Sequence, residues 1–111
     1  YTVYARFENV GGLAVRAKVS IAGVTIGNVA EISLDQATAQ ALVRMEIDSD
    51  VDQITLDSTA VILTEGLIGG KMIGITLGAD EAFLVEGDEI DDTQSAIVLE
   101  ELIGQFLLKQ F

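Results

Sequence analysis

The sequence predicts an all-β domain, a sandwich or barrel of short strands, followed by a helix at its C-terminal end. Short segments rich in Val, Ile and Thr are separated by Gly, Asn and Asp at close intervals, which is typical of small β-sandwiches and barrels. The chain has 111 residues, the size of one domain. Residues 93–111 differ from the rest, because their apolar side chains recur at helical spacing.

The first half of the chain contains several strand signals. Residues 2–7, within "YTVYARF", alternate in polarity and favour a strand. The stretch "AKVSIAGVTIGNVAEISL" predicts short strands joined by tight turns near residues 22–23 and 27–28, where Gly and Asn fall between β-branched residues. A further strand is expected at 41–47 after a polar connector at 35–40.

The second half continues the pattern. Residues 48–58 are polar and predict a loop, and residues 59–64, "TAVILT", predict a buried strand. Residues 71–77 are expected to pair with it, and 78–90 to form a loop with a short terminal strand. We expect these strands, of about five residues each, to be antiparallel and to form a small barrel.

Residues 93–111, "TQSAIVLEELIGQFLLKQF", are expected to form an amphipathic helix. Acidic and hydroxyl residues just before it could cap its N-terminus. We therefore divide the chain into a β domain, 1–92, and a C-terminal helix, 93–111. Packing on its own domain is the usual arrangement for such a helix, but crowded apolar side chains favour packing against copies of itself. The residues at helical spacing are Leu99, Leu102, Ile103, Phe106 and Leu107.

Charge and composition exclude several functions. The chain has 18 acidic and 6 basic residues and a net charge of −12, so nucleic acid is not an expected partner. It contains no His and no Cys, which removes Ser-His-Asp and Cys-His catalysis and the usual zinc sites. No run of about 20 apolar residues occurs. We expect a non-enzymatic protein without a metal or another cofactor.

One acidic motif resembles the start of a calcium-binding loop. Asp48, Asp50 and Asp52 have the alternate spacing of an EF-hand loop. That loop requires Gly at its sixth position and Glu at its twelfth, where this chain has Gln53 and Thr59. The motif is therefore interpreted as a solvated acidic loop.

Two other motifs are also set aside. The acidic run "EGDEIDD" at 86–92 is dense and contains glycine, which favours solvent exposure over the buried carboxylate that acid–base catalysis needs. The segment "GLIGGK" at 66–71 lacks both the spacing of a phosphate-binding loop and a Ser or Thr after its Lys.

The segment "TEGLIGGKMIGI" at 64–75 places two large aliphatic residues among glycines. Leu67 and Ile68 lie between Gly66 and Gly69-Gly70, where a turn is expected. They could belong to a tucked-in hairpin tip or to a strand, since single exposed aliphatics are common. Alternatively, the loop projects them into an apolar contact that another chain or a ligand provides.

Three stretches in the same order carry a resemblance to a known family. They are "VSIAGVTIGNVAEISL" at 19–34, "TAVILTEGLIGGKMIGITLG" at 59–78 and "EGDEIDDTQSAIVLEELIGQFL" at 86–107. Together they resemble one MCE (mammalian cell entry) domain, and more closely the MlaD-type subunits of bacterial phospholipid transport systems. The resemblance covers nearly the whole chain, and the ending "DDTQSAIVLEELIGQF" is its most specific part.

The resemblance implies a small β-barrel that assembles into a six-fold ring around a central hydrophobic pore. Leu67 and Ile68 would line that pore, and the C-terminal helices, through Leu99, Leu102, Ile103, Phe106 and Leu107, would form or support the lipid path. It further implies a subunit at the periplasmic face of the inner membrane, anchored by an N-terminal transmembrane helix. Its partners would be an ABC permease and ATPase, a soluble periplasmic lipid carrier and phospholipid, in a system that maintains outer-membrane lipid asymmetry.

Two alternatives remain at this point. A monomeric β-barrel could hold one hydrophobic ligand, although strands of about five residues leave little interior space. A surface adhesion or host-interaction protein is the other. Copy number in solution and extracted lipid would distinguish these alternatives from a lipid-transfer ring.

Overall fold

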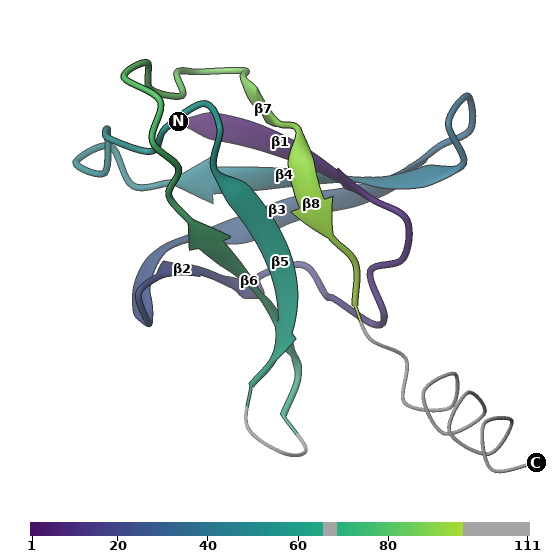
Figure 1. The fold of residues 1–111 in the computed structure, drawn as a ribbon. Helices are drawn as coiled ribbons and strands as arrows, with labels where there is room; N and C mark the ends of the chain where they lie inside the picture. The colour runs from purple at the N-terminus through teal and green to yellow at the C-terminus, as the bar shows by residue number, and fades with distance from the viewer. Residues whose placement is uncertain (66–68, 97–111) are drawn as a thin grey trace, which may run out of the picture.

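The computed structural model describes residues 1–65 and 69–96, which form one eight-stranded sheet rolled into a nearly closed barrel (Figure 1). The spatial order of the strands is β7-β1-β4-β3-β2-β6-β5-β8. The strands are β1 (Thr2–Phe7), β2 (Lys18–Ile21), β3 (Val24–Asp35), β4 (Gln40–Ile47), β5 (Thr59–Thr64), β6 (Lys71–Thr76), β7 (Glu89–Ile90) and β8 (Asp92–Gln94). The all-β prediction is confirmed, and the strands at 2–7, 41–47, 59–64 and 71–77 lie close to their predicted positions.

The barrel is closed by one short segment near the end of the described chain. β7 pairs in parallel with β1, and β8, which follows after Asp91, pairs in parallel with β5. The two edges of the sheet are therefore joined through a single residue. The Thr93 hydroxyl also donates a hydrogen bond to the Arg6 carbonyl at 2.7 Å, which ties β8 to β1.

The barrel interior is filled by the alternating apolar faces of the strands. On β1, for example, Val3, Ala5 and Phe7 are fully buried while the residues between them are half-buried. Such alternation is what a sheet with one core face requires. The largest fully buried apolar side chains are Phe7, Met45, Ile54, Ile73, Ile90, Val3, Val19, Val29 and Val43.

Strand direction and length differ from the prediction. The pairs β1–β7, β2–β6 and β5–β8 are parallel, so the barrel is mixed and not wholly antiparallel. Alternation and turn signals indicate where strands lie, but they do not specify which strands pair. β3 and β4 span 12 and 8 residues, longer than the five expected.

Of the two predicted turns, one is confirmed and one is wrong. Ala22 and Gly23 have φ of 53° and 80°, the positive values of a tight two-residue hairpin turn between β2 and β3. Gly27-Asn28 instead lies within β3, which runs on continuously. A Cβ at Gly27 would overlap the carbonyl oxygen of Glu46 on β4, so glycine serves close strand approach there.

The start of the predicted C-terminal helix also needs correction. Thr93 and Gln94 belong to β8, because β8 pairs with β5 and Thr93 bonds to β1. The remainder of the predicted helix, from residue 97, lies outside the described residues. Within the described ranges, no helix has the length and apolar character needed to cross a membrane.

Candidate functional site

The hairpin of β5 and β6 carries the predicted apolar loop. Its strands stay in register to the pair Thr64 and Lys71, and the Glu65 amide donates to the Gly70 carbonyl at 2.8 Å. A Cβ at Gly69 would overlap the carbonyl oxygen of Glu65, so the end of the hairpin requires glycine there. The predicted pore residues Leu67 and Ile68 lie outside the described residues, and their role stays a prediction.

Two polar contacts brace this hairpin at its loop end. The Lys18 ammonium on β2 lies 2.9 Å from the Glu65 carboxylate, beyond the end of β5. The Lys71 ammonium donates to the Thr64 hydroxyl at 2.7 Å. Exposed contacts of this kind contribute little stability, at most about 1 kcal/mol, so their effect is mainly to orient the hairpin.

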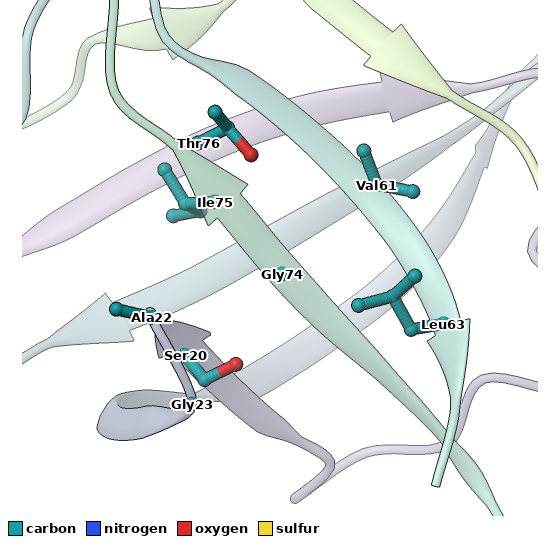
Figure 2. A pocket seen from close by; sticks show the side chains of 8 residues that line it. All are labelled: Ser20, Ala22, Gly23, Val61, Leu63, Gly74, Ile75 and Thr76. Atoms are coloured by element: carbon teal, nitrogen blue, oxygen red, sulfur yellow. The ribbon is translucent and has the colours of Figure 1, made fainter.

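A shallow groove of about 220 Å³ runs along the outer surface of the barrel beside the hairpin. Figure 2 shows Val61 and Leu63 on β5 flanking Gly74 on β6, with β2 on the other side. The groove exists partly because Gly74 has no side chain: a Cβ there would lie 2.8 Å from Leu63 Cδ1. Its lining residues are Ser20, Ala22, Gly23, Val61, Leu63, Gly74, Ile75 and Thr76.

This surface, hereafter the neutral face, carries no ionisable side chain among its lining residues. At the loop end of the hairpin, the Lys18 ammonium on β2 pairs with the Glu65 carboxylate, and the Lys71 ammonium donates to the Thr64 hydroxyl. Leu63 is 45% exposed and Val24, at the adjoining turn, is 64% exposed. An uncharged, partly apolar face is unusual on a chain with a net charge of −12.

Residues 95–96 lie near the loop end of the same hairpin. The Ser95 hydroxyl accepts hydrogen bonds from the amides of Glu8 and Asn9, and the Ala96 amide donates to the Asn9 carbonyl at 3.1 Å. A Cβ at Gly11, where φ is +58°, would overlap the Ala96 side chain and lie 3.9 Å from Lys71 Cε. Gly11 therefore marks the point where residues 95–96 and the start of β6 converge.

This convergence was not predicted from the sequence. "NVGG" at 9–12 has the composition of an ordinary turn, and its position against Ala96 depends on the closure of the barrel. The helix residues Leu99, Leu102, Ile103, Phe106 and Leu107 lie outside the described residues. Both segments predicted to line the lipid path, 66–68 and 97–111, therefore adjoin described residues at the same end of the barrel.

The two acidic motifs differ in their side-chain contacts. Asp48, Asp50 and Asp52 are exposed, and within 1–65 and 69–96 no three acidic residues converge as metal ligands would. Further along the chain, the Glu86 carboxylate accepts from the Thr2 amide at 2.6 Å and Asp92 from the Thr59 hydroxyl at 2.6 Å. These contacts fix loops and strands of the barrel.

Two carboxyl groups have shifted pKa values with clear causes. The Arg6 guanidinium, bonded to Asp35 at 3.1 Å and also to Glu89, lowers the pKa of Asp35. The amide of Asp80, followed by the Thr55 side chain and the amide of Ala79, lowers the pKa of Asp57. In both cases the hydrogen bonds lower the pKa because they stabilise the charged form of the carboxylate.

Together these features define a small β-barrel domain with a glycine-flanked aliphatic hairpin loop and an uncharged face beside it. The family model of the MlaD protein matches residues 1–78, and the chain belongs to this family. It is 46% identical to the intermembrane phospholipid transport system binding protein MlaD of Escherichia coli (strain K12) and to the protein of the same name from Haemophilus influenzae.

Each alignment covers 96% of this chain, but 61% of the E. coli protein and 66% of the H. influenzae protein. The chain thus spans less than two thirds of these relatives. The fold is also similar to a chain of the Acinetobacter MlaFEDB complex in its ATP-bound Vtrans1 conformation. That match has a TM-score of 0.88 and 29% sequence identity, and it covers 96% of this chain and 80% of the other.

Proposed function

We propose that this chain is the ring-forming, lipid-binding subunit of an ABC-type phospholipid transport system, and that it transfers lipid through a central apolar pore without catalysing a reaction. Membership of the MlaD family and relatives named as binding proteins of phospholipid transport support the proposal. The structural similarity to a chain of the MlaFEDB complex supports a permease and an ATPase as its partners.

The observation that carries this function is the convergence at Gly11. The hairpin that bears Leu67 and Ile68 and the chain leading into the helix adjoin each other there, at one end of the barrel. Two strongly apolar segments that start from the same place can form one continuous apolar path. Segments at opposite ends of the barrel could not do so without crossing its filled interior.

The neutral face supports assembly from copies of the same chain. Subunits with a charge of −12 repel one another unless their contact surfaces are uncharged or internally paired. Beside the hairpin the groove is uncharged, and Lys18 and Glu65 are paired. Copies arranged about an axis through their hairpins could therefore contact each other here. In such a ring the aliphatic loops shield one another from water.

Transfer through such a pore is passive. Burying a methylene group is favourable by about 0.8 kcal/mol, so a fully buried 16-carbon chain would gain roughly 12 kcal/mol as an upper bound. A continuous aliphatic lining keeps this gain nearly constant along the path, and the lipid can slide without a deep free-energy minimum. Direction would come from the ATPase partner, because no nucleotide-binding motif occurs in this sequence.

The finer features of the proposal concern assembly and location. We infer a ring of six copies at the periplasmic face of the inner membrane, held by an N-terminal transmembrane helix and exchanging phospholipid with a soluble periplasmic carrier. The filled interior favours this reading over a monomeric barrel that holds a ligand inside itself, since Phe7, Met45 and Ile73 occupy that space.

Native mass spectrometry of the purified chain tests the proposal, because one spectrum gives both copy number and retained lipid. A closed oligomer that releases phospholipid at higher collision energy is expected. A monomer with no lipid at any concentration contradicts the ring. A monomer that retains a single lipid favours the alternative of an internal binding site.

A further inference from the structure

The loops at the other end of the barrel, residues 48–58 and 77–88, form a surface that the proposed pore does not use. The first loop precedes β5 and the second follows β6, so both lie at the opposite ends of these strands from the pair Thr64 and Lys71 (Figure 1). We name them the acidic loops. Their conformation, exposed side chains and charge point to a single kind of partner.

The acidic loops are held in place by hydrogen bonds. The Leu56 amide donates to the Ala82 carbonyl at 3.0 Å and the Leu84 amide to the Ile54 carbonyl at 2.7 Å, which joins the two loops. The Asp57 carboxylate accepts from the Ala79 amide at 2.9 Å. A surface fixed in this way loses little conformational entropy when a partner binds.

Apolar side chains are exposed on these fixed loops. Phe83 is 43% exposed and Val85 is 63% exposed, although the backbone around them is well bonded. They line a groove of about 360 Å³ together with Tyr1 and Leu84, and Asp52 and Glu86 stand at its walls. Large apolar side chains held at the surface within a polar rim are typical of a binding surface.

The charge of the loops is of one sign. Each loop contains four acidic residues, so together they hold eight of the chain's 18, and neither contains Lys or Arg. None of the eight takes part in an ion pair with another described residue.

This charge decides between possible occupants. A second copy that met them loop to loop would be repelled, as would nucleic acid or an anionic bilayer, and the uncharged neutral face of a copy offers no positive charge to pair with these carboxylates. We propose that the acidic loops dock a second protein whose contact surface carries apolar side chains surrounded by Lys and Arg. The apolar side chains would enter the groove at Phe83 and Val85, and the basic rim would pair with the carboxylates and accelerate association.

Two synthetic helical peptides provide the probe. They share a leucine and tryptophan face and differ in the remaining positions, which are lysine in one and glutamine in the other. Fluorescence anisotropy with the full chain gives affinity, and hydrogen–deuterium exchange gives location. We expect the lysine peptide to bind, to protect residues 54–57 and 82–86, and to bind more weakly at high salt. The glutamine peptide should bind at least tenfold more weakly.

Matched variants separate the apolar contribution from charge alone. The double change Phe83→Ser and Val85→Ser should weaken binding of the lysine peptide at least tenfold. Val85→Ser alone, which alters only an exposed side chain, should weaken this binding by a smaller factor. The control Leu34→Ser changes a side chain on β3 of similar exposure to Val85, away from both surfaces, and should leave affinity unchanged.

Three results would overturn the docking surface. One is equal affinity of the Val85→Ser chain and its parent. Another is protection spread evenly over acidic surfaces outside the two loops. The third is a fall in copy number caused by Val85→Ser, since the loops would then contact a second copy. The first two leave the proposed lipid transfer untouched, because that depends on the hairpin end of the barrel. The third keeps the ring but moves its subunit contact from the neutral face to the acidic loops.

Discussion

The neutral face and the acidic loops are both exposed, partly apolar surfaces of one small barrel, yet they differ in charge. The groove of the neutral face has no ionisable lining residue, and the adjoining Lys18 and Glu65 pair with each other. The acidic loops carry eight carboxylates and no Lys or Arg. On a molecule of net charge −12, the first surface suits contact with identical copies and the second suits a basic partner.

This division assigns different consequences to similar substitutions at the two ends. Removing apolar character near the hairpin should affect lipid transfer and assembly. Removing charge from the acidic loops should leave both intact. The following predictions are ordered from the largest expected effect to the smallest.

Replacing Leu67 and Ile68 together by Asn should abolish lipid transfer in a reconstituted assay. A ring of polar side chains would interrupt the apolar path and impose a desolvation penalty on every passing acyl chain. Stability should change by only about 1 kcal/mol, as for most surface substitutions. Transfer at the parental rate would show that these residues do not line the pore. A loss of roughly 2–5 kcal/mol per residue in the free energy of unfolding would show that they belong to the core.

Replacing Leu63 by Glu should dissociate the oligomer while leaving the barrel folded. Leu63 is 45% exposed on the neutral face, so the charge costs little in a monomer but repels identical neighbours in a ring. Sedimentation velocity gives the copy number. Leu34→Glu is the matched control, because Leu34 is 67% exposed on β3, away from the groove. If both variants keep the parental copy number, the neutral face is not the subunit contact.

Replacing Asp48, Asp50 and Asp52 together by Asn should leave both lipid transfer and copy number unchanged. The three carboxylates are exposed at the acidic end, and no convergent metal site includes them among the described residues. Calorimetry with calcium should give no binding in the micromolar range. A calcium affinity that the triple variant loses would show that the acidic loops serve a cation.

The sequence predicted strand positions much better than strand partners. Alternating apolar residues at 2–7 and 41–47 directly reflect a sheet with one buried face, so these strands were found. The parallel pairs depend on how distant segments meet, which local periodicity does not contain. Gly27 was predicted to lie in a turn, because turns with a positive φ favour glycine. In the structure, glycine is needed there for a different reason, the close approach of β3 to the Glu46 carbonyl.

The candidate site shows the same limit. The aliphatic pair Leu67-Ile68 is visible in the sequence because apolar residues between glycines are conspicuous. The neutral face cannot be recognised in the sequence. Its lining residues come from three strands and one turn, and each of them is an ordinary uncharged residue. The convergence of Gly11, Lys71 and Ala96 likewise depends on the closure of the barrel by β7 and β8.

The smallest expected effect concerns acid. Arg6 on β1 bonds to Asp35 at the end of β3 and to Glu89 on β7, and it lowers the pKa of Asp35. A carboxyl group whose pKa is lower in the folded state contributes stability at pH values above its unfolded pKa, about 3.9, and loses it as the pH falls through the folded pKa. The Arg6 contact should therefore stabilise the barrel at neutral pH and cease to do so in acid.

Urea denaturation of the parent and of Asp35→Asn between about pH 6 and pH 2 measures this contribution, since the window brackets the unfolded pKa. The variant should be slightly less stable at pH 6, and the difference should shrink toward pH 2, because the folded parent then becomes progressively protonated at Asp35. Asp35 lines neither of the two grooves compared above, so copy number at neutral pH should not change. A stability difference that stays constant with pH would show that Asp35 acts through the amide hydrogen bond to Ala37 or through packing, and not through its charge on Arg6.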